Sequence, residues 1–395
     1  MKLGLAALAL LTSIAGARAD DPVANGKKLS EWLTMLKEDT LPRKRKAAVI
    51  VLGQMAGESK ETLAVVLPAL GKAMRNETNA GVRGQIATVF GAQPPEAMPL
   101  FVTDLAEAVR LEKDSAARRE QAVALGRMGK IARPAVLPLI DTLKDAAPAT
   151  RAAAADALGR IGGDARSATV ALLPLLKDAN RSVRLAAIFA LGRVDPEDPE
   201  PVSEAFVGIL GAQANRDRML AGAASVASSL AWAERRDDEM VQETVVALGL
   251  LGDRSPEVVQ AVANRLPDAS VEVRRQAALA LAKFGPASRG AEKSLVQSFH
   301  GDDDKTTRIY ALHALCTSFG TDAASVVGTV SARLAGEPEA EVRVAIAEEL
   351  GAFGPAAKEA LPALRAAQRD PQIKVREAAA VALRNIQKLP EKSKP

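Results

Sequence analysis

Apolar residues recur along this chain with the spacing of one helix face. Around Arg184 they stand one position before the arginine and three, four and seven positions after it, at Val183, Ala187, Ile188 and Leu191. Residues with this spacing lie on one side of an α-helix, so the pattern predicts a helix with a single buried face. A turn rich in glycine follows, as at 159–163, where glycine permits the positive φ angle that ends a helix.

A second apolar segment runs from this turn toward the next acidic residue, so each unit is predicted to be a helical hairpin. Examples are the segments 136–143, 258–266 and 326–334. Proline fits the first turn of such a helix and kinks the helix further in. Pro138 lies seven residues before its acidic residue but Pro174 only four, so Pro174 is expected to mark a kink or a late helix start.

The hairpin repeats along the chain, with an arginine in the first helix and an acidic residue six positions before it. We call the arginine position the anchor, and the ten anchors are Arg45, Arg83, Arg118, Arg151, Arg184, Val241, Arg274, Arg308, Arg343 and Arg376. Their separations are 33 to 38 residues apart from one of 57, and such a period indicates a solenoid. The preceding positions are Asp39, Glu77, Glu112, Asp145, Asp178, Arg235, Asp268, Asp302, Glu337 and Asp370.

The acidic residue and the arginine are predicted to form a structural pair. They are lost together in one unit, which has Arg235 and Val241 instead. The anchor falls on the buried stripe, where a guanidinium needs a partner. The acid can bind this arginine side chain to side chain, or it can cap the helix while it accepts from the arginine of an adjacent unit. Either arrangement predicts a ladder of ion pairs through the turns.

The predicted fold class is all-α, an α-α superhelix of about ten such hairpins over residues 26–388. Composition agrees, since 48% of the residues are hydrophobic and only 3% aromatic, which suits helices packed closely through alanine. Residues 25–38 carry apolar residues on one face and are expected to form a lone capping helix with Leu29, Trp32, Leu33 and Leu36 inside. The tail 389–395 is expected to be disordered.

The long step between anchors predicts an irregular insertion at about 213–238. An extra helix from Asn215 to about Arg235 would disturb the alternation of helices and kink the superhelix. Trp232, beside Arg235 and Arg236, is a candidate contact residue because tryptophan and arginine are frequent in binding hot spots. The interpretation that Trp232 fills a wedge in the stack is favoured, since large aromatic side chains are mostly buried.

The first nineteen residues resemble a cleavable secretory signal. Lys2 precedes an apolar run, and Ala17-Arg18-Ala19 precedes Asp20. Export to the periplasm or the extracellular space is therefore expected, with no membrane segment after cleavage. The remaining chain has 50 basic and 48 acidic side chains, so no nucleic-acid partner is expected.

Candidate chemical groups are few. Cys316 is the single cysteine, which excludes an intramolecular disulfide and cysteine zinc sites, and it is expected to be a small core residue. His300 with Asp302, Asp303 and Asp304 could hold a cation. A polar turn is favoured, because Asp302 is already an acid of the ladder and one histidine lacks a ligand set. We therefore expect no metal, no cofactor and no catalytic residue.

One basic run, PRKRK at 42–46, could bind phosphate. Because Arg45 is an anchor, a solvated helix start is the favoured interpretation.

The phrase DxxxxVRxxAAxALGxIG resembles the HEAT-like repeats of the phycobilisome lyase type over nearly the whole mature chain. The resemblance implies a right-handed superhelix whose second helices line a concave binding surface. Deoxyhypusine hydroxylases share the repeat but hold iron with His-Glu pairs, whereas His300 precedes Gly301 and His313 precedes Ala314. A pigment lyase fits poorly with export, and DNA glycosylases of this fold need a basic concave face with aromatic contacts.

The favoured hypothesis is an exported, non-enzymatic and monomeric scaffold that binds a protein partner on its concave surface. The alternative is an accessory or catalytic subunit of a lyase-like or nucleic-acid-processing enzyme. The repeat by itself does not distinguish these two hypotheses, because one fold serves many functions.

Overall fold

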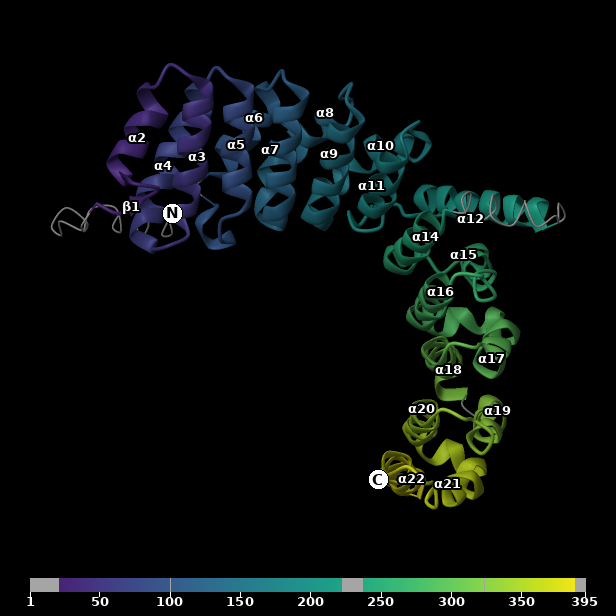
Figure 1. Cartoon of the computed structure of the whole chain (residues 1–395). Coiled ribbons are helices and arrows are strands. Elements are labelled where there is room, and N and C mark those ends of the chain that lie inside the picture. The colour runs from purple at the N-terminus through teal and green to yellow at the C-terminus, as the bar shows by residue number, and fades with distance from the viewer. Residues whose placement is uncertain (1–20, 100, 222–236, 323, 388–395) are drawn as a thin grey trace, which may run out of the picture. The chain divides into compact units, whose positions relative to one another are not determined.

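The computed structural model describes residues 21–99, 101–221, 237–322 and 324–387. The described chain is almost entirely helical and confirms the predicted all-α solenoid (Figure 1). It forms two compact units, Met1–Ile161 and Gly162–Pro395, and each is a stack of hairpins by itself. The predicted signal peptide, 1–19, and the tail, 389–395, lie outside the described residues. Within them no helix combines the length and the apolar character needed to cross a bilayer.

The first unit alternates anchor helices, which carry the anchor arginines, with second helices. Its anchor helices are α3 (Pro42–Ala56), α5 (Ala80–Gly91), α7 (Ser115–Met128) and α9 (Pro148–Ile161). Its second helices are α2 (Leu29–Glu38), α4 (Lys60–Asn76), α6 (Val102–Leu111) and α8 (Val136–Thr142). Short 3-10 helices precede α6 and α8, namely η1 (Pro95–Ala97) and η2 (Gly129–Ala135).

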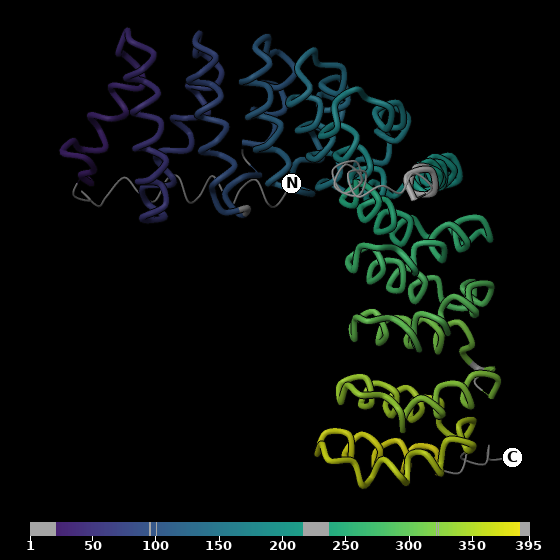
Figure 2. The backbone as a smooth tube through the Cα atoms, turned by 45° about the vertical axis from the view of Figure 1, so that its right-hand side comes forward, coloured from purple at the N-terminus to yellow at the C-terminus, as the bar shows by residue number. Residues whose placement is uncertain are grey.

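The second unit repeats this order. Its anchor helices are α11 (Arg181–Leu191), α14 (Asp238–Leu251), α16 (Val271–Phe284), α18 (Lys305–Phe319), α20 (Ala340–Ala352) and α22 (Ile373–Gln387). Its second helices are α10 (Thr169–Leu172), α12 (Glu200–Ala221), α15 (Pro256–Ala263), α17 (Glu292–Gly301), α19 (Ala324–Leu334) and α21 (Leu361–Ala367). The 3-10 helices are η3 (Gly162–Ala168), η4 (Leu173–Lys177), η5 (Gly285–Ala291), η6 (Gly320–Asp322) and η7 (Gly354–Ala360). Figure 2 shows these hairpins stacked one after another.

The amino-terminal end differs from the prediction. A small hairpin of β1 (Val23–Ala24) and β2 (Lys27–Lys28) precedes α2, which begins at Leu29 instead of Asn25. Asn25 and Gly26 have φ angles of 48° and 76°, and this pair favours the tight turn of a two-residue hairpin. Trp32 is buried in the cap as predicted, and its Nε1 donates to the carbonyl of Ala24 at 2.9 Å.

The apolar stripe identified in the sequence forms the core. Val183, Ala187, Ile188 and Leu191 are completely buried, and the positions three and seven after the anchor are buried in the other anchor helices as well. Pro174 interrupts its second helix as predicted, because α10 ends at Leu172 and continues as the 3-10 helix η4.

Glycine has two distinct roles in the repeat. Gly162, at the end of α9, has φ of 75° and ends the helix as predicted. The glycine that directly follows the repeated leucine stays helical and allows close packing instead. A Cβ on Gly351 would stand 2.8 Å from the Cα of Ala382 in the next anchor helix, so any side chain there would clash. The anchor helices therefore pack with little space between their backbones.

The predicted irregular insertion is only partly described. Helix α12 runs without a break from Glu200 to Ala221, so the expected separate helix start at Asn215 is wrong. The rest of the predicted extra helix, with Trp232, Arg235 and Arg236, lies outside the described residues. The predicted kink depends on that segment and remains a prediction.

Candidate protein-binding surfaces

The ladder pair is formed between consecutive repeats. The Nε and Nη2 of Arg45 donate to the two carboxylate oxygens of Glu77 at 2.7 and 2.6 Å. The Nη1 of Arg45 donates to the backbone carbonyls of Asp39 and Thr40 at 2.9 and 3.2 Å. Glu77 also accepts from the backbone N–H of Asn79 at 2.8 Å. One guanidinium thus joins its own turn to the turn of the next repeat.

The same pairing between consecutive repeats recurs along both units. The further pairs are Arg83 with Glu112, Arg118 with Asp145, Arg274 with Asp302, Arg308 with Glu337, and Arg343 with Asp370. In all six pairs the acidic side chain is at most 10% exposed and the arginine at most 22%. The predicted ladder is confirmed, and of the two arrangements considered the acid accepts from the adjacent repeat's arginine.

The ladder lowers the pKa of Glu77, Glu112 and Glu337. Burial alone would raise the pKa of the Glu77 carboxyl, but the hydrogen bonds from Arg45 and from the N–H of Asn79 outweigh it and the net pKa is lowered. Glu112 and Glu337 behave in the same way. The acids are therefore held ionised in the turns, where they stabilise the fold and are not available as proton donors.

A displaced pair stands near the unit that lacks the ladder residues. Arg184 donates to the carbonyls of Asp178 and Ala179. Three residues earlier, Arg181 binds both carboxylate oxygens of Asp237 at 2.9 and 2.5 Å. Asp237 also caps α14 by accepting from the N–H of Met240 at 3.1 Å. Arg181 and Asp237 thus join α11 to α14, in place of the anchor arginine and ladder acid that join the regular repeats.

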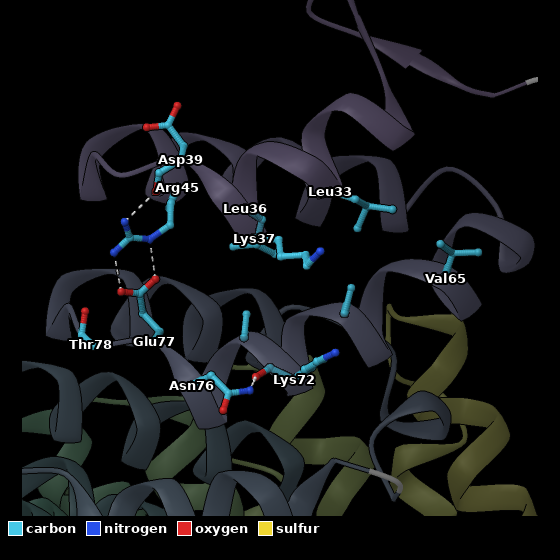
Figure 3. Close-up of a pocket in the computed structure, with 12 residues that line it drawn as sticks. Leu33, Leu36, Lys37, Asp39, Arg45, Val65, Lys72, Asn76, Glu77 and Thr78 are labelled. Carbon is cyan, nitrogen blue, oxygen red and sulfur yellow. Dashed lines mark hydrogen bonds and ion pairs between the residues drawn. The ribbon is translucent and has the colours of Figure 1, made fainter.

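A groove of about 510 Å³ opens between the second helices α2 and α4 (Figure 3). Leu33 and Val65 lie at one end, and the Arg45–Glu77 pair lies at the other. Lys37 on α2 and Lys72 on α4 stand between these ends. The rest of the lining is Leu36, Asp39, Ala69, Ala73, Asn76 and Thr78. Three cations and two carboxylates therefore line a largely apolar groove.

The second unit has an equivalent groove of about 440 Å³ between α15 and α17, above the Arg274–Asp302 pair. Its α17 wall occupies the same repeat positions as the α4 wall of the first groove. Counted from the ladder acid, Ser294, Gln297, Ser298, Gly301 and Asp303 replace Ala69, Lys72, Ala73, Asn76 and Thr78. One cation and three carboxylates line this groove, so it is polar and acidic.

The solvent-facing side of the anchor helices carries several apolar residues at the end of the second unit. Positions one, two and five after the anchor point away from the core there. They carry Ile309, Tyr310, Val344 and Val381, together with two alanines and with His313, Glu348 and Glu377. Val381 is 45% exposed. A further groove of about 540 Å³ lies between α20 and α22, lined by Val344, Val381 and several alanines, and also by Glu348, Lys374 and Glu377.

The acidic turn near His300 is occupied by arginines. Arg274 binds both Asp302 and Asp303, and Arg275 binds Asp304, which also caps α18 through the N–H of Thr307. Burial lowers the pKa of His300, and nearby Arg333 lowers it further. In the described part of the chain no cluster of three metal-ligating side chains occurs. The carboxylates considered for a cation site are thus part of the ion-pair network.

Cys316 is buried in α18, 3% exposed, as predicted. It stands at the repeat position where other anchor helices have glycine. Burial raises the pKa of its thiol, and nearby Glu349 raises it further. Glu349 itself lies 2.7 Å from the Nδ1 of His313. A thiol held protonated in this way is a packing residue and a poor nucleophile.

The basic run at 42–46 forms the first turn of α3, with Pro42 at its start. Arg45 is occupied in the ladder, whereas Arg43 and Lys46 are exposed. This agrees with the favoured interpretation of a solvated helix start.

Comparison with known proteins supports the fold. An engineered protein of known structure has a TM-score of 0.56 and 20% identity, over 91% of this chain and 99% of that one. Importin beta has a TM-score of 0.55 and 14% identity, over 90% of this chain and 52% of its own. The karyopherin Kap121p, bound to the extreme C-terminus of the protein phosphatase Cdc14p, has a TM-score of 0.53 and 12% identity, over 91% and 45%.

The chain spans about half the length of importin beta and of Kap121p. No curated protein matches the sequence. The family model for HEAT repeats matches four overlapping regions, 102–192, 136–227, 226–316 and 327–394. These regions cover more than half of the chain, and they contain the ladder pairs from Arg118 onward. The protein belongs to the HEAT-repeat family.

Proposed function

We propose that this protein is a non-enzymatic scaffold that binds a protein partner on the solvent-facing side of its anchor helices. The repeated charged residues are occupied in the ladder, so they hold the stack together and leave recognition to other positions. Kap121p, which has the same fold, holds the C-terminus of a phosphatase, so binding a protein segment is compatible with this architecture. Fold alone does not define a function, so the proposal rests on the exposed residues of the anchor helices.

The inner surface of each unit belongs to the anchor helices in this proposal. Gly126 packs against Ala157 and Gly351 against Ala382, so neighbouring anchor helices lie close together. Leucine and phenylalanine side chains such as Leu70 and Phe101 separate the second helices. A stack bends toward the row with the closer spacing. We therefore assign the concave surface to the anchor helices, whereas the family resemblance assigned it to the second helices.

The single observation that carries the proposal is the group of apolar side chains on the solvent-facing side of α18, α20 and α22. Tyr310 is the one tyrosine of the chain, and it lies partly exposed on this face beside Ile309. Val344 and Val381 continue the surface into the groove between α20 and α22. Tyrosine flanked by aliphatic side chains is typical of the centre of protein interfaces.

Site-specific crosslinking tests this proposal. A photo-reactive amino acid at position 310 should give a discrete protein adduct in extracts of the source cells. The matched control is the same amino acid at position 120, because Glu120 occupies the equivalent position of α7 in the first unit. Tyr310→Asp combined with Val381→Asp should abolish capture of that partner. Adducts of equal yield at both positions, or co-purification of pigment or nucleic acid instead, would contradict the proposal.

We also propose that the protein acts outside the cytoplasm after loss of residues 1–19. Support comes from the sequence of this segment and from the first described residues. Asp21 accepts hydrogen bonds from the N–H and Oγ of Ser30, so a chain starting at Asp20 keeps the contacts of the cap. Mass spectrometry of the protein from the periplasmic and culture fractions should find Asp20 as the first residue. An intact Met1 in the cytoplasmic fraction would refute export.

A further inference from the structure

The groove between α2 and α4 is lined by lysines and exposed aliphatic residues that the fold does not require. Its counterpart between α15 and α17 sits above an equivalent ladder pair with serines, Gln297 and Asp303 in the lining. Both units therefore fold with quite different residues at these positions. The lysines and exposed aliphatic residues of the first groove are thus free to serve binding.

The apolar part of the groove follows helical spacing. Val65, Ala69 and Ala73 are spaced by one turn along α4, and Leu33 faces them from α2. Val65 is 46% exposed, so its apolar side chain is accessible to a partner. From Val65 to Asn76 the wall is roughly 16 Å long, about three helical turns. A helix laid along α4 would place side chains three and four residues apart into this row.

The charge of the groove is complementary to an acidic partner. Lys37 stands on the α2 wall and Lys72 on the α4 wall, one on each side of the apolar row. Lys37 is 75% exposed and pairs with the exposed Glu38, and no ion pair of Lys72 occurs within the described ranges. The carboxylates at the end of the groove are already bound, Glu77 by Arg45 and Asp39 by Lys44.

We propose that this groove docks an acidic amphipathic helix of a partner protein. Apolar side chains on one face of that helix enter between α2 and α4, and carboxylates on its two flanks bind Lys37 and Lys72. The site lies on the second helices of the first unit and is separate from the anchor-helix face proposed above. Either site can therefore fail in an experiment without affecting the other.

The test uses a defined probe, a fluorescein-labelled stapled helix of about four turns with a leucine stripe flanked by glutamates. The control probe has lysines in place of the glutamates. Fluorescence anisotropy with the full chain should show at least about tenfold tighter binding of the acidic probe, and salt should weaken it. Lys37→Glu combined with Lys72→Glu should reverse this preference. Gln297→Glu, the matched change in the α15–α17 groove, should have no effect.

Three results would overturn the proposal. One is equal binding of the acidic and basic probes, and another is full binding by the variant with both lysines reversed. The third is a dimer in sedimentation velocity that Lys72→Glu dissolves, because the occupant would then be a second copy of the chain. Both lysines are exposed, so the variants should keep the thermal stability of the original protein, and Val65→Asp provides an independent loss of binding.

Discussion

The grooves at α2–α4 and α15–α17 show what the repeat conserves and what it leaves variable. Both have a ladder pair at one end, Arg45 with Glu77 and Arg274 with Asp302, with the same bidentate geometry. Five residues before the ladder acid, the first groove has Lys72 and the second has Gln297. One position after the acid, the first has Thr78 and the second has Asp303, whose side chain is 87% exposed.

The difference separates stability from recognition. The ladder residues are buried and tie consecutive repeats together, so they are constrained by folding. The lining residues touch solvent and change from apolar and basic to polar and acidic without altering the hairpin. In a solenoid, neighbouring repeats can therefore carry unrelated binding sites on one architecture.

The largest expected effect is the loss of a ladder arginine. Arg45→Ala and Arg274→Ala should each lower the free energy of unfolding by about 3 kcal/mol, because each leaves a buried carboxylate without its guanidinium. Chemical denaturation measures this, with Lys72→Gln as a control that should change stability by less than about 0.5 kcal/mol. A loss below about 1 kcal/mol in both arginine variants would mean that the pairs behave as surface ion pairs.

The second prediction concerns the row of anchor helices. Gly126→Leu should destabilise the first unit by about 2 kcal/mol, because its Cβ would stand 3.1 Å from the Cα of Ala157. Gly208→Leu in the second helix α12 is the matched control, since nothing lies within 4 Å of a Cβ there. That change should be neutral or slightly stabilising. Thermal unfolding of both variants decides whether the anchor row is the closely packed one.

Low pH should weaken the ion pairs of the ladder. The folded pKa of Glu77 is lower than its ordinary value, so its contribution is complete above the ordinary carboxylate pKa and is lost as pH falls toward the folded pKa. The free energy of unfolding should therefore decline below about pH 4.5. Glu77→Gln should be less stable at pH 7 and should decline less steeply in acid. An identical slope in the two proteins would show that Glu77 does not contribute.

The smallest effect on stability is expected when lining residues of the α2–α4 groove are replaced by those of the α15–α17 groove. Lys72→Gln combined with Thr78→Asp gives the first groove two residues of the second, and stability should change by less than about 0.5 kcal/mol. Binding of the acidic probe helix should nevertheless be lost. A large loss of stability would show that these lining residues also support the fold.

The sequence predicted the parts of the molecule that depend on periodicity. The helix faces, the ladder and the interruption at Pro174 follow from residue spacing alone. The Asn25-Gly26 hairpin was missed although this dipeptide is a strong turn signal. The continuity of α12 past Asn215 was also missed, although no proline or glycine cluster marks a boundary there.

The grooves themselves lay beyond sequence reasoning. Lys37 and Lys72 are 35 positions apart and look like ordinary solvated lysines until α2 and α4 are placed side by side. For a similar reason the sequence did not decide which acidic residue each arginine binds, because the acid of the next repeat is about one repeat away in the sequence. Only the stacking of repeats brings Arg45 to Glu77.

A double-mutant cycle on Arg45 and Glu77 tests the central claim most directly. Unfolding free energies of Arg45→Ala, Glu77→Ala and the double variant give the coupling between the two side chains. The ladder account predicts a favourable coupling above about 1 kcal/mol across the repeat boundary. Additive effects of the two substitutions would contradict it.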